Sequence, residues 1–282
     1  MLNFPNAKIN IGLNITEKRK DGFHNLETVF YPIFLSDIIE FIEVPDDQNN
    51  NHISLKITGL KIKGSFEENL CIKAYFLLKK KFFEEIPDIN IHLHKIIPMG
   101  SGLGGGSSNG AYMLKFLNET LNLNLSNKEL KDFAVQLGSD APFFIENKPA
   151  FARGKGEILQ YINLNLEGYF LYIVKPNFSV NTANAYKNIV PREPKLSLKY
   201  SVSTPISEWK NLIFNDFEKN IFFKYPEIRN IKNKLYDLGA SYASMSGSGS
   251  SVYGIFKEEV KIKKYFPKNY FLWKEELKKY RI

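Results

Sequence analysis

Cysteine and long apolar runs are both scarce in this chain of 282 residues. Its single cysteine, Cys71, excludes an internal disulfide, and we expect a reducing compartment for the protein. No segment approaches the ~18–20 consecutive apolar residues that a membrane span requires. The opening residues, MLNFPNAKIN, lack the basic start and apolar stretch of a signal peptide. We therefore expect a cytoplasmic protein that does not enter a membrane.

Positive charge is in modest excess: the chain has 38 Lys and Arg against 30 Asp and Glu, a net charge of +8. A basic balance favours polyanionic partners such as nucleic acid, an acidic membrane surface or phosphorylated small molecules. The basic residues are spread along the chain, however, and a general bias in composition explains them more simply. Hydrophobic residues make up 44% and charged residues 24%, which are ordinary values for a globular protein with a sizeable core.

Apolar spacing predicts a mixture of strands and helices without a regular βαβ alternation. Strands are expected at residues 7–15, 28–44, 53–60 and 89–94, in EGYFLYIVKP, and on both sides of the loop in ASYASMSGSGSSVYGIF. Helices are expected from a Ser65/Glu68 capping box to about Phe83, after the glycine-rich segment through Leu121, from a Ser126/Glu129 capping box to Gly138, and in PEIRNIKNKLYDL. This mixture predicts an α+β fold with two lobes, residues 1–150 and 151–282.

Cys71 lies on the first of these predicted helices, beside Leu70 and Ala74. These apolar neighbours predict a buried structural thiol rather than a nucleophile.

One third of the 18 glycines lie in a single segment, PMGSGLGGGSSNG, from Pro98 to Gly110. A strand is expected before this segment and a helix after it. In that arrangement bare amide N–H groups and the positive end of the helix dipole form a binding site for phosphate. Ser107, Ser108 and Asn109 stand where the helix begins and could cap it or donate to an anion.

Two familiar nucleotide-binding loops and a flexible linker fit the glycine segment less well. A P-loop requires Gly-Lys-Ser/Thr at its end, and this segment has no lysine. Gly100, Gly102 and Gly105 match the dinucleotide pattern G-x-G-x-x-G, but that pattern requires a preceding strand that opens a parallel βαβ unit. Here the preceding strand has a polar face and follows a long amino-terminal region. A flexible linker is disfavoured because a regular helix follows directly.

The glycine segment resembles the phosphate-binding motif of the GHMP small-molecule kinases. Seven further segments resemble one branch of that family in order, from about residue 5 to residue 256: PNAKINIGLNI, KDGFHNLETVF, FEENLCIKA, LGSDAPFF, ARGKGE, FNDFE and SGSGSSVYGIF. The substrate of that branch is cytidine-diphosphate methylerythritol, in the non-mevalonate isoprenoid pathway, and DGFH and GSDAPFF are typical of it. The resemblance implies a ribosomal-protein-S5-like amino-terminal lobe and a ferredoxin-like carboxy-terminal α/β sandwich.

The resemblance also implies which residues bind ATP. They are Asn69, near the adenine, and the loop residues Pro98, Met99, Gly100, Ser101, Gly102, Leu103, Gly104, Gly105, Gly106, Ser107 and Ser108. Ser101 and Gly110 replace residues that are usually Ala or Gly in the family, and both are small enough to leave the loop path open. Asn69 has an equally simple structural role as a polar residue at the start of a helix.

Lys8 and Asp140 match the catalytic pair of the family. The resemblance implies that Asp140 accepts the proton of the 2-hydroxyl of the substrate, while Lys8 orients Asp140 and offsets phosphate charge. In a loose transition state the proton leaves late, so we expect orientation of the hydroxyl to matter more than basicity. The structural alternatives are a lysine at a strand edge that points into water and a turn aspartate.

Five residues match positions that contact the substrate. Phe23, His24 and Tyr186 correspond to the site of the cytosine ring, and Asn10 and Thr182 to positions near the methylerythritol and diphosphate. The family often has tyrosine where Phe23 stands, so stacking is kept while a hydroxyl contact is lost. Core packing is the competing role for both aromatic residues.

Mg²⁺ is expected to bridge the ATP phosphates, and the sequence leaves its ligands open, with Ser107 and Ser108 as candidates beside Asp140. His92 and His94 share a strand face, but without an acidic or cysteine partner nearby they fit a solvated polar face better than a metal site.

We expect a monomer or weak homodimer that binds no nucleic acid. The open alternatives are a homoserine- or mevalonate-type kinase, which a substrate panel would identify, and an RNA-binding module, which would show steep salt dependence. An oxidoreductase would show bound nicotinamide by absorbance.

Overall fold

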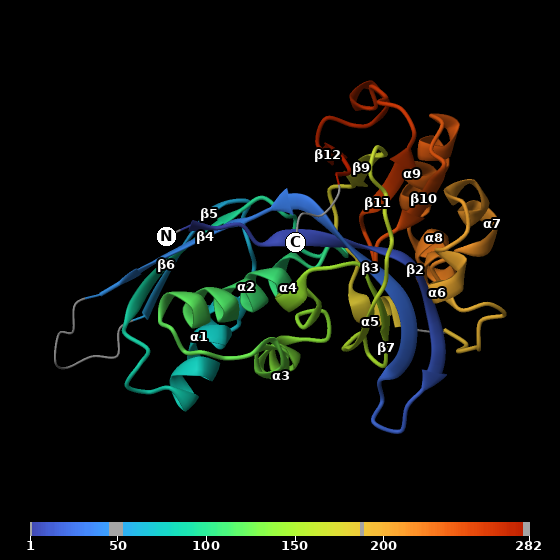
Figure 1. Ribbon diagram of the computed structural model, residues 1–282. Coiled ribbons are helices and arrows are strands. Elements are labelled where there is room, and N and C mark those ends of the chain that lie inside the picture. Colours follow the sequence, from blue (N-terminus) through green and yellow to red (C-terminus); the bar gives the residue numbers. More distant parts are fainter. Residues whose placement is uncertain (1, 45–52, 187–188, 279–282) are drawn as a thin grey trace. The chain divides into compact units, whose positions relative to one another are not determined.

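The structure, a computed structural model, describes residues 2–44, 53–186 and 189–278 and has an α+β fold (Figure 1). The strands are β1 (Leu2–Asn3), β2 (Asn6–Lys18), β3 (His24–Ser36), β4 (Ile38–Glu43), β5 (Ile53–Gly59), β6 (Ile89–Lys95), β7 (Ala150–Arg153), β8 (Ile158–Tyr161), β9 (Phe170–Lys175), β10 (Tyr242–Met245), β11 (Val252–Phe256) and β12 (Phe271–Glu276). The helices are α1 (Leu70–Lys81), α2 (Gly105–Thr120), α3 (Asn127–Leu137), α4 (Phe143–Glu146), α5 (Thr182–Tyr186), α6 (Leu198–Ser201), α7 (Trp209–Leu212), α8 (Phe217–Lys224) and α9 (Pro226–Asp237), with short 3₁₀ turns η1 (Ile206–Glu208) and η2 (Lys263–Tyr265).

The chain forms two compact units that interleave in the sequence. The first unit contains residues 1–7, 34–99 and 104–147, and the second contains residues 8–33, 100–103 and 148–282. The glycine segment therefore passes from the first unit into the second and back again. No single position in the sequence separates the two units. The division into lobes near residue 150 stays a prediction.

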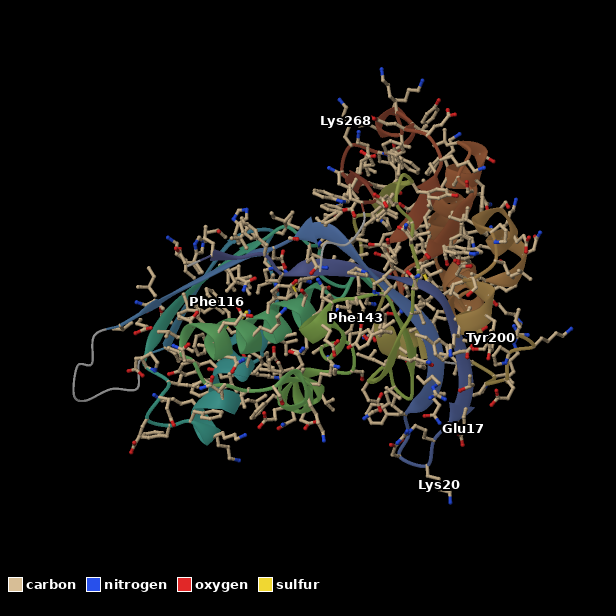
Figure 2. The ribbon with its side chains drawn as sticks, in the orientation of Figure 1. Glu17, Lys20, Phe116, Phe143, Tyr200 and Lys268 are labelled. Atoms are coloured by element: carbon tan, nitrogen blue, oxygen red, sulfur yellow. The ribbon has the colours of Figure 1, made fainter. Side chains whose placement is uncertain are left out.

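In the first unit, helices cover one face of a four-stranded sheet with the order β1-β4-β6-β5 (Figure 1). Along β6, Ile89, Ile91 and Leu93 are buried while the residues between them are not, as the alternating pattern predicts. The ring of Phe116 from α2 packs against Phe41 from β4, with 4.5 Å between centroids. Figure 2 marks Phe116, which is nearly fully buried, and this contact fixes α2 on the sheet.

The second unit contains a sheet with the order β10-β11-β9-β12, and most of the sheet β2-β3-β7-β8. The long helix α9 packs on β10 and β11 through Ile228, Ile231 and Leu235, which recur at helical spacing and are all buried. Proline at its first position suits the start of this helix, because the missing N–H would have no partner there.

Two predictions of local structure are wrong in a way that bears on the site. The Ser65/Glu68 pair does not open a helix: Glu68 accepts the N–H of Ser65, but α1 begins at Leu70, with Asn69 as its N-cap. The predicted strand 28–44 is interrupted at Asp37, whose side chain is fully buried and bonded to other segments of the first unit. The capping box Ser126/Glu129 and the helix end at Gly138 are confirmed.

Cys71 is a buried free thiol, as predicted, and burial raises its pKa to about 12. Within residues 2–44, 53–186 and 189–278, none of the helices combines the length and the apolar character needed to cross a membrane.

Candidate functional site

The glycine segment forms a tight loop between β6 and α2. Gly100, Gly102 and Gly104 have φ angles of +57°, +75° and +72°, a conformation that other residues adopt only with strain. Gly104 is the N-cap of α2, so the sixteen-residue helix begins immediately after the last of the three. The predicted arrangement of strand, glycine loop and helix is confirmed.

The carbonyl groups of this loop are turned toward the protein. The carbonyl oxygens of residues 100–103 all accept hydrogen bonds from the second unit, and the donors are the N–H groups of Ser250, Ser251 and Lys8 and the ammonium of Lys8. By contrast, the N–H groups of Gly102 and of residues 104–107 have no hydrogen-bond partner in the described part of the chain. Backbone donors left unpaired at a helix N-terminus are the usual ligands of an anion.

The loop after β10 lies directly against the glycine loop. The hydroxyl of Ser246 donates to the carbonyl of Gly102 at 2.8 Å. A Cβ atom on Gly102 would stand 1.9 Å from the carbonyl oxygen of Ser246, so only glycine allows this approach. The predicted loop in ASYASMSGSGSSVYGIF is thus anchored to the glycine loop through Ser246, a residue that the sequence analysis did not single out.

Lys8 is buried in β2, with only 3% of its surface exposed. Its Nζ donates to the side-chain oxygen of Asn10 and, at 3.2 Å, to the carbonyl of Gly102, and it lies 5.0 Å from the ring centre of Phe30. The alternative of a strand-edge lysine that points into water is wrong. Burying an ammonium costs several kcal/mol unless it is paired and hydrogen-bonded. The oxygens of Asn10 and Gly102 supply hydrogen bonds that offset this cost.

Asn10 orients Lys8 and is itself held on three sides. Its amide nitrogen donates to Thr28 Oγ1 at 3.0 Å, and Thr28 donates to the carbonyl of Gly12. Its backbone N–H donates to Ser246 Oγ, and its carbonyl accepts the hydroxyl of Tyr253 at 2.8 Å. Only 3% of Asn10 is exposed, so its observed role is to place the Lys8 ammonium.

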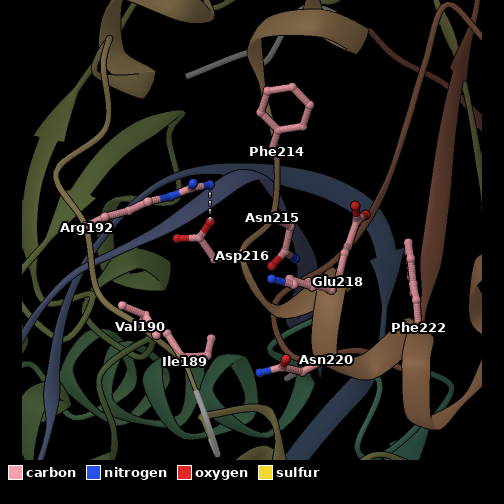
Figure 3. A pocket seen from close by; sticks show the side chains of 10 residues that line it. Ile189, Val190, Arg192, Phe214, Asn215, Asp216, Glu218, Asn220 and Phe222 are labelled. Carbon is pink, nitrogen blue, oxygen red and sulfur yellow. Dashed lines mark ion pairs between the residues drawn. The ribbon is translucent and has the colours of Figure 1, made fainter.

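The segment FNDFE connects β2 with the loop after β10. Asn215 donates through its side chain to the carbonyls of Met245 and Gly247, at 2.9 and 2.8 Å. Asp216 accepts the N–H of Ile15 and lies 3.7 Å from Arg192, the ion pair drawn in Figure 3. A cavity of 540 Å³ opens beside these residues. The sequence analysis noted FNDFE only as part of a resemblance, and no local pattern in this segment indicates the contacts that Asn215 makes.

The segment that leads to Thr182 is also anchored in the second unit. Ser250 Oγ and the ammonium of Lys175 both donate to the carbonyl of Phe178, at 2.6 and 2.9 Å. Burial lowers the pKa of Lys175. Thr182 begins α5, and its side chain lies outside the described residues.

Three of the residues predicted to bind substrate, Phe23, His24 and Tyr186, belong to the second unit. The rings of His24 and Tyr186 are stacked, with centroids 5.0 Å apart and an interplanar angle of 23°. Phe23 is 57% exposed, and the ammonium of Lys155 lies 4.9 Å from its ring centre. Core packing is therefore not the role of Phe23. Partial burial and the positive charge of Lys18 lower the pKa of His24.

Asp140, Asn69 and the two ends of the glycine segment belong to the first unit. Asp140 is partly buried in the turn between α3 and α4. Ser107 Oγ lies 3.8 Å from the place of a Cβ on Gly138, two residues before Asp140. Ser108 is fully buried, and its hydroxyl has no partner in the described part of the molecule. The pairing of Asp140 with Lys8 stays a prediction.

Three of the residues predicted to bind ATP, Asn69, Pro98 and Met99, have defined local surroundings in the structure. Asn69 caps α1, since its side-chain oxygen accepts the N–H of Cys71 at 2.9 Å. Met99 is 45% exposed, and its sulfur accepts the N–H of Lys63. Pro98 is half-buried at the start of the loop. An N-cap contributes about 1 kcal/mol to a helix, so Asn69 has a structural role besides any contact with a nucleotide.

His92 and His94 both contact Thr58, whose Oγ1 lies 2.8 and 2.9 Å from their ring nitrogens. Across the described ranges, three or more His, Cys, Asp or Glu side chains do not gather at any point where they could hold a metal ion.

Comparison with known proteins adds independent findings. Residues 69–148 match the model of the GHMP kinases N terminal domain, and residues 198–270 match that of the GHMP kinases C terminal domain. The chain is 52% identical to 4-diphosphocytidyl-2-C-methyl-D-erythritol kinase of Bacteroides fragilis, over 99% of this chain and 100% of that one. A crystal structure of 4-(cytidine 5'-diphospho)-2C-methyl-D-erythritol kinase superposes with a TM-score of 0.74 at 30% identity, over 90% of each chain. A homoserine kinase from Cytophaga hutchinsonii shares the fold, with a TM-score of 0.64 at 18% identity over 97% and 95% of the two chains.

Proposed function

Since the chain belongs to the 4-diphosphocytidyl-2-C-methyl-D-erythritol kinases of the GHMP kinase family, we propose that it phosphorylates the 2-hydroxyl of that cytidine-diphosphate alcohol. The phosphoryl donor is ATP, and the products are ADP and the 2-phosphate of the substrate. This reaction lies in the non-mevalonate route to isoprenoid precursors. The chain is an ATP-dependent small-molecule kinase with a two-lobed GHMP fold.

The observation that carries the proposal is the direction of the backbone groups in the glycine loop. Because the carbonyls of residues 100–103 accept from the protein, the unpaired N–H groups of Gly102 and of residues 104–107 are available as donors. Fixed N–H dipoles stabilise charge that builds on phosphate oxygens without having to reorient during the reaction. The positive end of the α2 dipole adds to this effect.

In the proposed mechanism Lys8 and Asp140 act on the transferred phosphoryl group and its acceptor. Asp140 orients the 2-hydroxyl and takes its proton as the bond to phosphorus forms. Lys8, held by Asn10 and the carbonyl of Gly102, brings a fixed positive charge to the phosphates. Positioning of this kind supplies most of the rate enhancement in phosphoryl transfer.

Mg²⁺ fits this site only as a partner of the ATP phosphates. The described residues contain no ready metal cluster, which agrees with the preference of Mg²⁺ for one or two carboxylates plus phosphate oxygens and water. Asp140 is the carboxylate that we propose for it. Ser107, half-buried beside Gly138, is a better candidate for a hydroxyl ligand than the fully buried Ser108. Bound Mg²⁺ would neutralise phosphate charge.

The cytosine of the substrate is proposed to stack on the exposed ring of Phe23, beside the His24–Tyr186 pair. An aromatic stack contributes roughly 1–3 kcal/mol per base. The similarity to homoserine kinase is at 18% identity and concerns the fold alone, so it does not favour another acceptor. We also propose that the enzyme acts in the cytoplasm, where ATP is available, as a monomer or weak homodimer that binds no nucleic acid.

The test is incubation of the purified protein with ATP, Mg²⁺ and 4-diphosphocytidyl-2-C-methyl-D-erythritol, followed by ³¹P NMR. We expect a new phosphomonoester signal together with ADP, and none with homoserine or mevalonate as acceptor.

Asp140→Asn is expected to reduce turnover by orders of magnitude while ATP still binds. Phosphorylation of homoserine or mevalonate instead would overturn the substrate assignment, and near-normal turnover of Asp140→Asn would remove this residue from the mechanism.

A further inference from the structure

We infer that Asp37 is a positioning residue for the nucleotide loop, because its carboxylate fastens the chain on both sides of that loop. This inference rests on the proposed function of the loop in binding ATP. Asp37 lies between β3 and β4 and is completely buried in the first unit. It therefore cannot contact a substrate and acts through the segments that it binds.

On the side where the chain enters the loop, one carboxylate oxygen accepts two backbone donors. Asp37 Oδ1 accepts the N–H groups of Ile96 and Ile97, at 2.7 and 2.8 Å. These residues directly precede Pro98. The end of β6 is thereby held at a fixed place just before the loop begins.

On the side where the chain leaves the loop, the second oxygen binds α2. Asp37 Oδ2 accepts the side-chain N–H of Asn109 at 2.9 Å and also pairs with the ammonium of Lys95. Lys95 donates in turn to Asn109 Oδ1 at 3.0 Å, so the three side chains form a closed network. Asn109 lies one turn after Gly105, and on a helix this spacing places both residues on the same face. The network thus fixes the first turns of α2 relative to β6.

Gly105 lets this network approach the start of the helix. A Cβ at this position would lie 2.8 Å from Ile97 Cγ2 and 3.4 Å from Lys95 Nζ. Lys95 is 4% exposed, and a cation near a helix N-terminus is unfavourable unless an anion accompanies it. Asp37 supplies that anion.

A buried ion pair is seldom the most stable way to fill a core, since well-packed apolar residues often do better. Its hydrogen bonds, however, fix distances and directions that apolar contacts leave adjustable. Here the network holds residues 96 and 97 against residue 109, and the unpaired N–H groups of residues 104–107 lie between them in the sequence. The geometry of those donors depends on this fixed distance.

The experiment compares Asp37→Asn, Lys95→Met, Asn109→Ala and wild type for binding of a non-hydrolysable ATP analogue by calorimetry and for steady-state kinetics. Asp37→Asn places an amide nitrogen among donors and should weaken binding of the analogue, and raise the KM for ATP, at least about tenfold. The KM for the cytidine-diphosphate alcohol should change by less than about threefold. Leu130→Ala is the control, because it removes a buried side chain of α3 in the same unit and leaves the network intact.

If Asp37→Asn weakens nucleotide binding no more than Leu130→Ala at a similar loss of thermal stability, the inference is wrong. Asn109→Ala keeps the Asp37–Lys95 pair and removes only the bonds to α2, so it provides the same test should Asp37→Asn fail to fold. Failure of wild type to bind the analogue would contradict the proposed function itself. Binding by wild type with no selective effect in the variants would contradict only the role of Asp37.

Discussion

The ammonium of Lys8 lies 3.2 Å from the carbonyl oxygen of Gly102, so a buried cation in β2 holds the centre of the glycine loop. The backbone N–H of Lys8 also donates to the carbonyl of Leu103, at 3.0 Å. Lys8 therefore joins β2 to the glycine loop by two hydrogen bonds. A change at Lys8 should disturb the path of the loop as well as the charge near the phosphates.

Lys8→Met is expected to lower kcat about 100-fold or more, the range seen when a preorganised charge-stabilising donor is removed. The KM for ATP should rise as well, because the carbonyl of Gly102 loses one of its donors. Steady-state kinetics with each substrate varied in turn measures both effects. Lys18→Met, at the exposed end of the same strand, is the control and should retain most of the activity. Equal losses in the two variants would contradict the role of Lys8.

The course of the loop could be predicted from the sequence, because glycine at positions 100, 102 and 104 is needed where φ is positive. The side chains that hold the loop could not be predicted. Ser246 and Asn215 both lie more than a hundred residues beyond Gly102 in the chain. No local pattern indicates that Ser246 bonds to the glycine loop or that Asn215 bonds to the loop after β10. Spacing identifies faces of helices and strands, but contacts between distant segments depend on how those elements pack.

The same limit explains the errors around Asp37 and Asn69. The apolar run from residue 28 to 44 reads as one strand, and the turn at Asp37 arises because its carboxylate binds Ile96, Ile97 and α2. Ser65 and Glu68 satisfy a capping-box pattern, yet the helix begins at Leu70, where Asn69 bonds to the N–H of Cys71. A cap pattern names several possible starts, and the packing of the apolar face selects one of them.

Gly102→Ala is expected to reduce kcat/KM for ATP about 100-fold or more, as a displacement of about 1 Å in a reacting site does. The new methyl group would stand 1.9 Å from the carbonyl oxygen of Ser246, so the loop must move. Gly106→Ala, in the first turn of α2 within the same glycine segment, is the matched comparison. Its Cβ would lie 3.8 Å from its nearest neighbour, Leu70 Cδ1, so its loss should be much smaller. Comparable losses would show that the steric argument at Gly102 is incorrect.

His24 should make the stability of the protein depend on pH below neutrality. Burial and Lys18 lower its pKa in the folded state below the usual ~6.5, so the unfolded chain binds more protons between the two values. Above pH ~6.5, His24 is neutral in both states and does not change the free energy of unfolding. As the pH drops below ~6.5 toward the pKa of the folded state, the unfolded chain takes up the proton first, and the free energy of unfolding falls. His24→Gln should show a smaller decrease between pH 7 and pH 5 in urea unfolding. NMR titration of the imidazole, assigned with this variant, should give a pKa below ~6.5; a higher value would reverse the expected sign.

Phe23→Ala should raise the KM for the cytidine-diphosphate alcohol far more than the KM for ATP. The ring of Phe23 is 57% exposed, so the folded protein gains little from it, and surface substitutions usually change stability by no more than about 0.5 kcal/mol. Loss of a stack worth roughly 1–3 kcal/mol corresponds to an increase in KM of about fivefold to 150-fold. Phe23→Tyr keeps the aromatic face and should behave like wild type. Equal increases for both substrates, or a large fall in melting temperature, would mean that Phe23 supports the hairpin of β2 and β3 rather than the cytosine.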